Sequence, residues 1–124
     1  LTSALLSAGR LDAATSFVEA ADDLVHDMDP APWLQAGVLH GRAQLALHRG
    51  HRDELALHAS DLAQLAATQS FATMAIDASE LTAAALGPST DRTRLLADTD
   101  AARQRLGYRW RPLAHAAGGT DAQV

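Results

Sequence analysis

Histidine is the first residue type in this sequence that could carry out chemistry, because the chain has six histidines and no cysteine. His48, His51 and His58 could meet across a turn at Gly50, with Asp53 or Glu54 as an added carboxylate. Zinc takes three or four such ligands in a tetrahedral array. However, the spacing matches no His-Glu-x-x-His motif, and histidines that flank a helix end commonly interact with the last helical carbonyl groups. We therefore expect no metal ion, and a His/Asp site is kept as an alternative.

The acidic and hydroxyl side chains form no catalytic pattern. The densest group of acids is Asp22, Asp23, Asp27 and Asp29, at an expected helix end and a proline-containing loop, where carboxylates are usually solvated. No Gly-x-Ser-x-Gly sequence surrounds a serine. A Gly-x-x-x-x-Gly-Lys phosphate loop is excluded because the chain contains no lysine. We expect no catalytic residue, no cofactor and no enzyme activity in this segment.

Aromatic and arginine residues alternate in one short stretch that could contact a partner. This stretch consists of Tyr108, Arg109, Trp110 and Arg111. Such residues dominate the energetic centres of protein interfaces, and they can also stack on nucleic-acid bases. A structural role, in which Trp110 covers the exposed end of the last helix pair, ranks ahead of a partner contact, and nucleic acid ranks last.

The distribution of charge argues against nucleic acid as a partner. Residues 1–86 carry four arginines against eleven acidic residues, a net charge of −7, and residues 87–124 carry six against four, a net charge of +2, which together give −5. Phosphate binding relies on clusters of lysine and arginine. We expect no direct nucleic-acid binding by this segment.

The elements that position these candidates are expected to be helices. Alanine and leucine supply much of the 48% hydrophobic content and are strong helix formers, whereas valine and isoleucine are scarce, so the composition predicts an all-α fold. After a helix end at residues 1–8, the expected helices span about 11–26, 32–49, 52–68, 71–86 and 90–106. The apolar stripe expected to be buried on the first full helix consists of Ala14, Phe17, Val18, Ala21, Leu24 and Val25.

A repeat of about 41 residues organises these helices. Leu24, Leu65 and Leu106 recur at this constant interval, and the turn glycines Gly9 and Gly50 keep the same spacing. Such a period predicts a short α-solenoid of antiparallel helix pairs over residues 1–107, followed by a partly disordered tail or linker over 108–124. Because the chain begins in the middle of an apolar pattern, we expect it to be a fragment of a longer protein.

The turn sequences of this repeat are similar to those of a known family. The runs 9–14 and 50–55 resemble the turn of the tetratricopeptide repeat, which has glycine, an acidic residue and then a packing alanine, as at Ala14. Leu55 replaces that alanine in the second run, and Leu39, Ala46 and Ala59 stand where aromatic residues often occur. The period is also longer than the roughly 34 residues usual in that family. The chain therefore resembles a divergent tetratricopeptide-like repeat.

The stretch 101–110 is similar to the last repeat helix of the large ATP-binding LuxR-type transcription regulators, which often ends in Leu-Gly followed by an aromatic residue. The resemblance implies that the parent chain carries an ATPase upstream and a DNA-binding helix-turn-helix downstream. It also implies that this region senses a ligand or a partner and relays its binding to the attached domains.

Repeats of this kind often bind on the inner surface that the first helix of each pair lines. On the helix expected over 32–49, the candidates for this surface are Trp33, Gln35, His40, Arg42 and Gln44. Exposed ends of a short repeat also predict pairing with a second copy as a homodimer.

The function expected from the sequence is therefore a non-catalytic module of a larger bacterial transcription or signalling regulator, which binds a protein partner or senses a small effector. No apolar run approaches the roughly 20 residues that span a membrane, and the lack of cysteine is compatible with a reducing cytoplasm, where we expect the protein. The alternative is a self-contained helical bundle with a His/Asp site for a metal or a small ligand.

Overall fold

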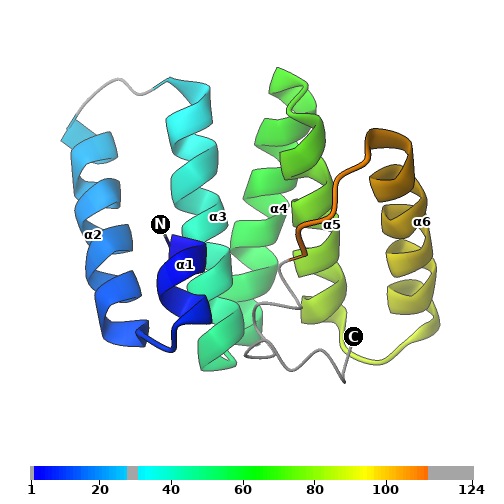
Figure 1. The fold of residues 1–124 in the computed structure, drawn as a ribbon, viewed down its shortest axis with the longest axis horizontal. Helices are drawn as coiled ribbons and strands as arrows, with labels where there is room; N and C mark the ends of the chain where they lie inside the picture. The colour runs from blue at the N-terminus through cyan, green and yellow to red at the C-terminus, as the bar shows by residue number, and fades with distance from the viewer. Residues whose placement is uncertain (1, 28–30, 112–124) are drawn as a thin grey trace.

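The computed structural model describes residues 2–27 and 31–111, and all regular secondary structure in these residues is α-helical (Figure 1). The all-α class predicted from the sequence is confirmed for this part of the chain. Its helices are α1 (Thr2–Ser7), α2 (Leu11–Asp27), α3 (Pro32–Arg49), α4 (Arg52–Gln69), α5 (Ala72–Leu86) and α6 (Thr90–Leu106). The predicted ends of the five longer helices agree with these bounds to within one residue.

The short turns between the helices follow from local sequence. Gly50 ends α3 with φ of 71°, a left-handed conformation that glycine adopts without steric cost, and the N–H of His51 donates to the carbonyl of Ala46 at 2.9 Å. Gly107 ends α6 in the same way. Ser89 precedes α6, and its side chain accepts from the N–H of Arg92 at 3.1 Å. These caps set the direction in which each following segment leaves its helix.

The helices stand side by side in a row from α2 to α6, and α1 lies against both α2 and α3 (Figure 1). The main core is formed where α3, α4 and α5 meet. It consists of Ala36, Ala43, Ala46, Leu55, Ala59, Leu62, Ala78 and Leu81, which are at most 3% exposed. A smaller cluster where α1, α2 and α3 meet consists of Leu6, Ala14, Val18 and Leu45. Because alanine fills little space, these helices must approach one another closely.

The contact between α6 and α5 differs from the contacts between the other neighbouring helices. Its buried residues are Thr99 and Arg103, and neither is apolar. After Gly107 the chain turns back from α6 across α5, as the orange segment of Figure 1 shows. Of the tail expected over 108–124, residues 108–111 are placed in this returning segment, and residues 112–124 lie outside the described residues.

Candidate functional site

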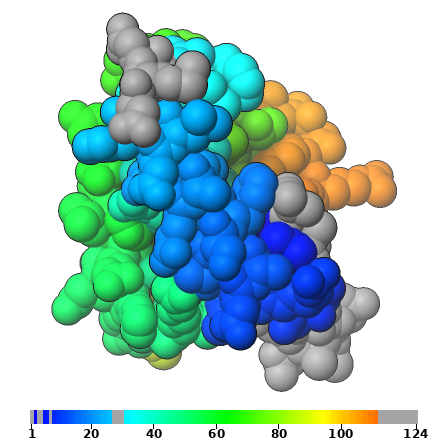
Figure 2. All heavy atoms as spheres, turned by 90° about the vertical axis from the view of Figure 1, so that its left-hand side faces the viewer, coloured from blue at the N-terminus to red at the C-terminus, as the bar shows by residue number. Residues whose placement is uncertain are grey.

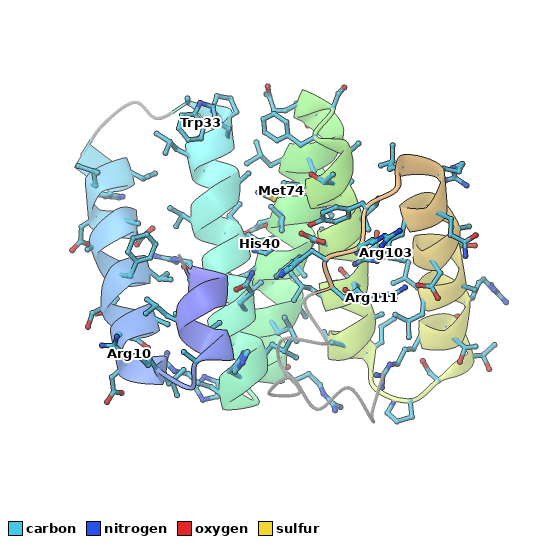
Figure 3. All side chains as sticks on the ribbon, in the orientation of Figure 1. Arg10, Trp33, His40, Met74, Arg103 and Arg111 are labelled. Atoms are coloured by element: carbon cyan, nitrogen blue, oxygen red, sulfur yellow. The ribbon has the colours of Figure 1, made fainter. Side chains whose placement is uncertain are left out.

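An apolar groove of about 440 Å³ lies between α2 and α3. Its walls include Phe17, Leu24 and Val25 of α2, Trp33 and Val38 of α3, and Met74 of α5. Helix α2 faces the viewer in Figure 2, and Figure 3 labels Trp33 near one end of α3 and Met74 on α5. This groove is mainly apolar, and it is open to solvent.

Three of the groove's large side chains are exposed. Leu24 is 63% exposed, Trp33 is 64% exposed and Phe17 is 40% exposed. The expectation that Phe17 and Leu24 are buried is therefore wrong. Their periodicity does place them on the inward-facing stripe of α2, but within the described residues α1 covers only one end of that stripe, where Ala14 and Val18 are buried.

Two polar side chains of the groove lining, His40 and Gln44, are hydrogen-bonded within the chain. Nε2 of His40 donates to Oδ2 of Asp77 at 3.0 Å. Nδ1 of His40 then accepts from Nε2 of Gln44 at 2.5 Å. The ring of Trp110 lies against the imidazole with 5.3 Å between ring centroids. Both nitrogens of His40 are thus bonded within the chain, and the ring is held between α3, α5 and the returning segment.

Asp77, the partner of His40, belongs to a buried network of charged groups. Asp77, Glu80 and Arg103 are each 3% exposed. Nη2 of Arg103 donates to Oε2 of Glu80 at 2.7 Å and lies 3.7 Å from Oδ1 of Asp77, while Nη1 donates to the main-chain oxygen of Trp110. Tyr108 Oη donates to Oδ2 of Asp77 at 2.8 Å. Arg103 and Tyr108 therefore fasten α6 and the returning segment to α5.

Burial changes the acidity of two groups in this network. The pKa of Glu80 is raised because burial disfavours its charged form, and the charge of Arg103 opposes this effect. The pKa of Tyr108 is raised by burial and by its hydrogen bond to Asp77. At the outer edge of the network, Arg111 donates to Oδ1 of Asp100 at 2.9 Å and lies 4.0 Å from Oε1 of Glu80. The arginines thus offset much of the carboxylate charge.

The binding candidates taken from the sequence separate into groups. Three of those on α3, Trp33, His40 and Gln44, line the groove. Gln35 is exposed outside it. Arg42 lies outside the groove and pairs with Asp22 beside a separate, smaller hollow of about 210 Å³.

The candidates in the returning segment are also divided. Tyr108, Trp110 and Arg111 are partly buried against the network, whereas Arg109 is exposed. The contact between His40 and Trp110 joins this set to the set on α3. Sequence reasoning did not identify Asp77, Glu80 and Arg103. A signal was present, since two acids three positions apart are the only charged residues of the mainly apolar α5.

The histidines considered as metal ligands do not come together. Nδ1 of His48 lies 3.1 Å from the main-chain oxygen of Gln44, and His51 lies 3.5 Å from Glu54. His58 lines the same smaller hollow as Arg42, and burial, aided by the charge of Arg42, lowers its pKa. In residues 2–27 and 31–111, no group of three or more histidine and acidic side chains could hold a metal ion.

Comparisons with known proteins identify no relative. The sequence matches no family model, and it matches neither a curated protein nor a solved structure. None of the helices in the described part of the chain is both long enough and apolar enough to cross a membrane.

Proposed function

We propose that this chain is a non-catalytic helical-repeat module that binds a protein partner or a small effector in the groove between α2 and α3. The observation that carries the proposal is the groove itself. Leu24 of α2 and Trp33 of α3 both line it, and each exposes nearly two thirds of its surface. Soluble proteins rarely leave a rimmed apolar hollow of this kind open unless something binds there.

The contacts between helices support a short α-solenoid. In this interpretation, α1–α2, α3–α4 and α5–α6 are antiparallel pairs that repeat with a period of about 41 residues. Helix α3 lies against α1 and α5, so that the first helices of the pairs are neighbours, as on the inner face of such a repeat. The groove is formed in part by α3 and therefore lies beside this inner face.

The chemistry of the groove favours binding over catalysis. Most of its lining is apolar; of its polar residues, His40 and Gln44 are bonded to each other, and His40 is also bonded to Asp77. A catalytic base needs a nitrogen or oxygen that can reach the substrate proton, and both nitrogens of His40 already have partners in the chain. Covering the exposed surfaces of Leu24 and Trp33 would instead contribute roughly 1–2 kcal/mol each to binding.

The groove is also suited to relaying an event to the C-terminal side. His40 lines the groove, bonds to Asp77 and contacts the ring of Trp110. Asp77 in turn accepts from Tyr108 of the returning segment. An occupant that shifts His40 would therefore change the position of residues 108–111, and binding would favour one arrangement of attached domains over another.

In the parent protein we propose that these attached domains are an ATPase and a DNA-binding domain, as in a cytoplasmic bacterial regulator resembling the LuxR type. Reading the gene on both sides of this segment tests this assignment. A nucleotide-binding domain upstream and a helix-turn-helix downstream are expected. Stop and start signals directly flanking the segment would overturn it and leave a free-standing domain.

The binding role of the groove is tested with an apolar fluorescent dye, 1-anilinonaphthalene-8-sulfonate. We expect the dye to bind the unmodified chain and to bind Leu24→Gln and Trp33→Gln more weakly. Leu57→Gln is a matched control, because Leu57 of α4 is 59% exposed but does not line the groove. Equal binding by all three variants would show that the dye is not in the groove and would contradict the proposal.

A further inference from the structure

We infer that Asp77 is a two-position switch, which holds the returning segment (residues 108–111) in one position and releases it in the other. In the position that the structure shows, Asp77 accepts from Tyr108 and from His40. In the second position, both of its oxygens accept from Arg103, and the returning segment leaves α5. The switch goes beyond the proposed function, because it is built into α5 and α6 and needs no occupant of the groove.

The observed position uses only one oxygen of the Asp77 carboxylate for hydrogen bonds. Oδ2 accepts both from Tyr108 Oη at 2.8 Å and from Nε2 of His40 at 3.0 Å. Oδ1 is buried and has no hydrogen-bond partner among the described residues. A buried acceptor without a donor costs free energy, so the observed position leaves the carboxylate incompletely satisfied.

Arg103 also has an unpartnered atom in this contact. Its Nε is buried without an acceptor among the described residues, and its Nη2 lies 3.7 Å from Oδ1 of Asp77. Nε and Nη2 share one edge of the guanidinium, where two parallel N–H groups can bind both oxygens of a carboxylate. Because Nη2 carries two hydrogens, its bond to Glu80 can remain while the second hydrogen turns to Asp77.

A small rotation of the Asp77 carboxylate therefore leads from one set of bonds to another. When the carboxylate turns to the Nε–Nη2 edge of Arg103, the two unpartnered atoms gain a bond to each other's side chain. Oδ2 then leaves Tyr108 and His40. Each position thus satisfies part of the same buried network and leaves another part without partners, which is the basis of a bistable element.

The returning segment depends on the first position. Tyr108 is bonded to Asp77, and its ring centroid lies 5.3 Å from the guanidinium carbon of Arg103. Further along the segment, Arg111 pairs with Asp100, but these side chains are 38% and 50% exposed, so water weakens their attraction. Loss of the buried bond to Asp77 therefore favours movement of the segment away from α5.

His40 connects this switch to the groove. Its ring lines the groove, donates to Oδ2 of Asp77 and contacts the ring of Trp110. This connection alone rests on the proposed function. An occupant that draws His40 away would remove one of the two donors to Oδ2 and would favour the pair between Asp77 and Arg103.

The first measurement is the quenching of Trp110 fluorescence by acrylamide, which reports how accessible the returning segment is. Trp33→Phe is introduced in every protein, so that Trp110 is the only tryptophan. Tyr108→Phe removes a donor to Oδ2, and we expect it to raise the quenching constant about twofold while the helical circular dichroism is unchanged. Arg109→Gln is the matched control, because Arg109 is exposed on the same segment, and it should leave the quenching constant unchanged.

The second measurement is the chemical shift of the Arg103 Nε–H proton in a nuclear magnetic resonance spectrum. We expect this proton to move downfield in Tyr108→Phe, because it gains a carboxylate acceptor. Arg111→Gln removes the charge that pairs with Asp100 and should move both readouts in the same direction. It replaces Tyr108→Phe if that variant does not fold.

Two results would overturn the switch. If the variants leave both the quenching constant and the Nε–H shift unchanged, the returning segment has one fixed position. If the quenching constant rises but the Nε–H proton does not move, the segment frays without a new pair between Asp77 and Arg103. Neither result affects the proposed function, which the dye tests separately, and a failure of the dye to bind leaves the switch intact.

Discussion

Arg103 of α6 donates to Glu80 of α5 across 2.7 Å, and both side chains are only 3% exposed. This pair lies in the contact between α5 and α6. Among the helices of the described residues, only α6 contributes no buried apolar side chain. A buried ion pair gains attraction from the low dielectric of its surroundings, but each ion loses its hydration. Moving or removing either partner would leave the other charge buried and unpaired, so the pair holds α6 on α5 in one register.

Replacing Arg103 with methionine tests this anchoring. Arg103→Met leaves Glu80 and Asp77 buried without their cation and removes the donor to the main-chain oxygen of Trp110. We expect the free energy of unfolding, measured by urea denaturation, to fall by about 3 kcal/mol or more. Arg94→Met is the matched control, because Arg94 is exposed on the same helix, and its effect should stay within about 0.5 kcal/mol. Equal effects of the two variants would contradict the anchoring role.

The raised pKa of Glu80 predicts a particular dependence of stability on pH. Because burial raises its pKa in the folded chain, the folded state binds more protons than the unfolded state between the ordinary pKa of 4.5 and the raised value. The stability of the unmodified chain relative to Glu80→Gln should therefore be greatest below the ordinary pKa and should decline as the pH rises through the raised value. The measurement is urea denaturation of both proteins from about pH 4 to about pH 8. A difference that grows with pH would refute the prediction.

Tyr108 should keep its proton in the folded chain at a pH where the unfolded chain releases it. Burial and the hydrogen bond to Asp77 raise its pKa above the ordinary value of 10.0. Stability should therefore fall, relative to Tyr108→Phe, as the pH rises through about 10. At neutral pH, Tyr108→Phe should cost roughly 1–2 kcal/mol, because Asp77 loses a donor. Since Tyr108 is the only tyrosine, phenolate absorbance reports its proton directly, and titration near pH 10 without unfolding would contradict this prediction.

The helices could be predicted from the sequence because their signals are local. Gly50 and Gly107 end helices with left-handed backbone conformations, and the spacing of alanine and leucine between these breaks has the period of a helix. The candidates Trp33, His40 and Gln44 could also be placed on one helix face by their spacing. Their shared position in the groove then follows from the orientation of α3 alone.

The buried network could not be predicted in the same way. Asp77 and Glu80 lie on α5, whereas their partners Arg103 and Tyr108 come much later, on α6 and in the returning segment. A pairing over that distance depends on how α6 packs, which periodicity does not specify. The exposure of Leu24 was missed for a related reason, because a helical stripe shows which side chains share a face but not whether another helix covers that face.

Two glycines of α3 provide a final test of how closely α2 and α3 approach. A Cβ added at Gly37 would meet nothing within 4 Å, whereas a Cβ added at Gly41 would lie 3.1 Å from Cγ2 of Val18 and 3.4 Å from Oγ1 of Thr2. Gly37→Ala should therefore stabilise the chain by about 0.5–1 kcal/mol through helix propensity. Gly41→Ala should gain less or lose stability, because the gain is offset by moving α2 or α1 away from α3.

Thermal and urea unfolding of the two variants measure this difference directly. The positions are one helical turn apart on the same helix, so their intrinsic helix propensities are matched and the neighbouring atoms are what differ. Equal stabilisation by both alanines would mean that α2 can move away from Gly41 at no cost. The contact at Gly41 would then not fix the width of the groove between α2 and α3.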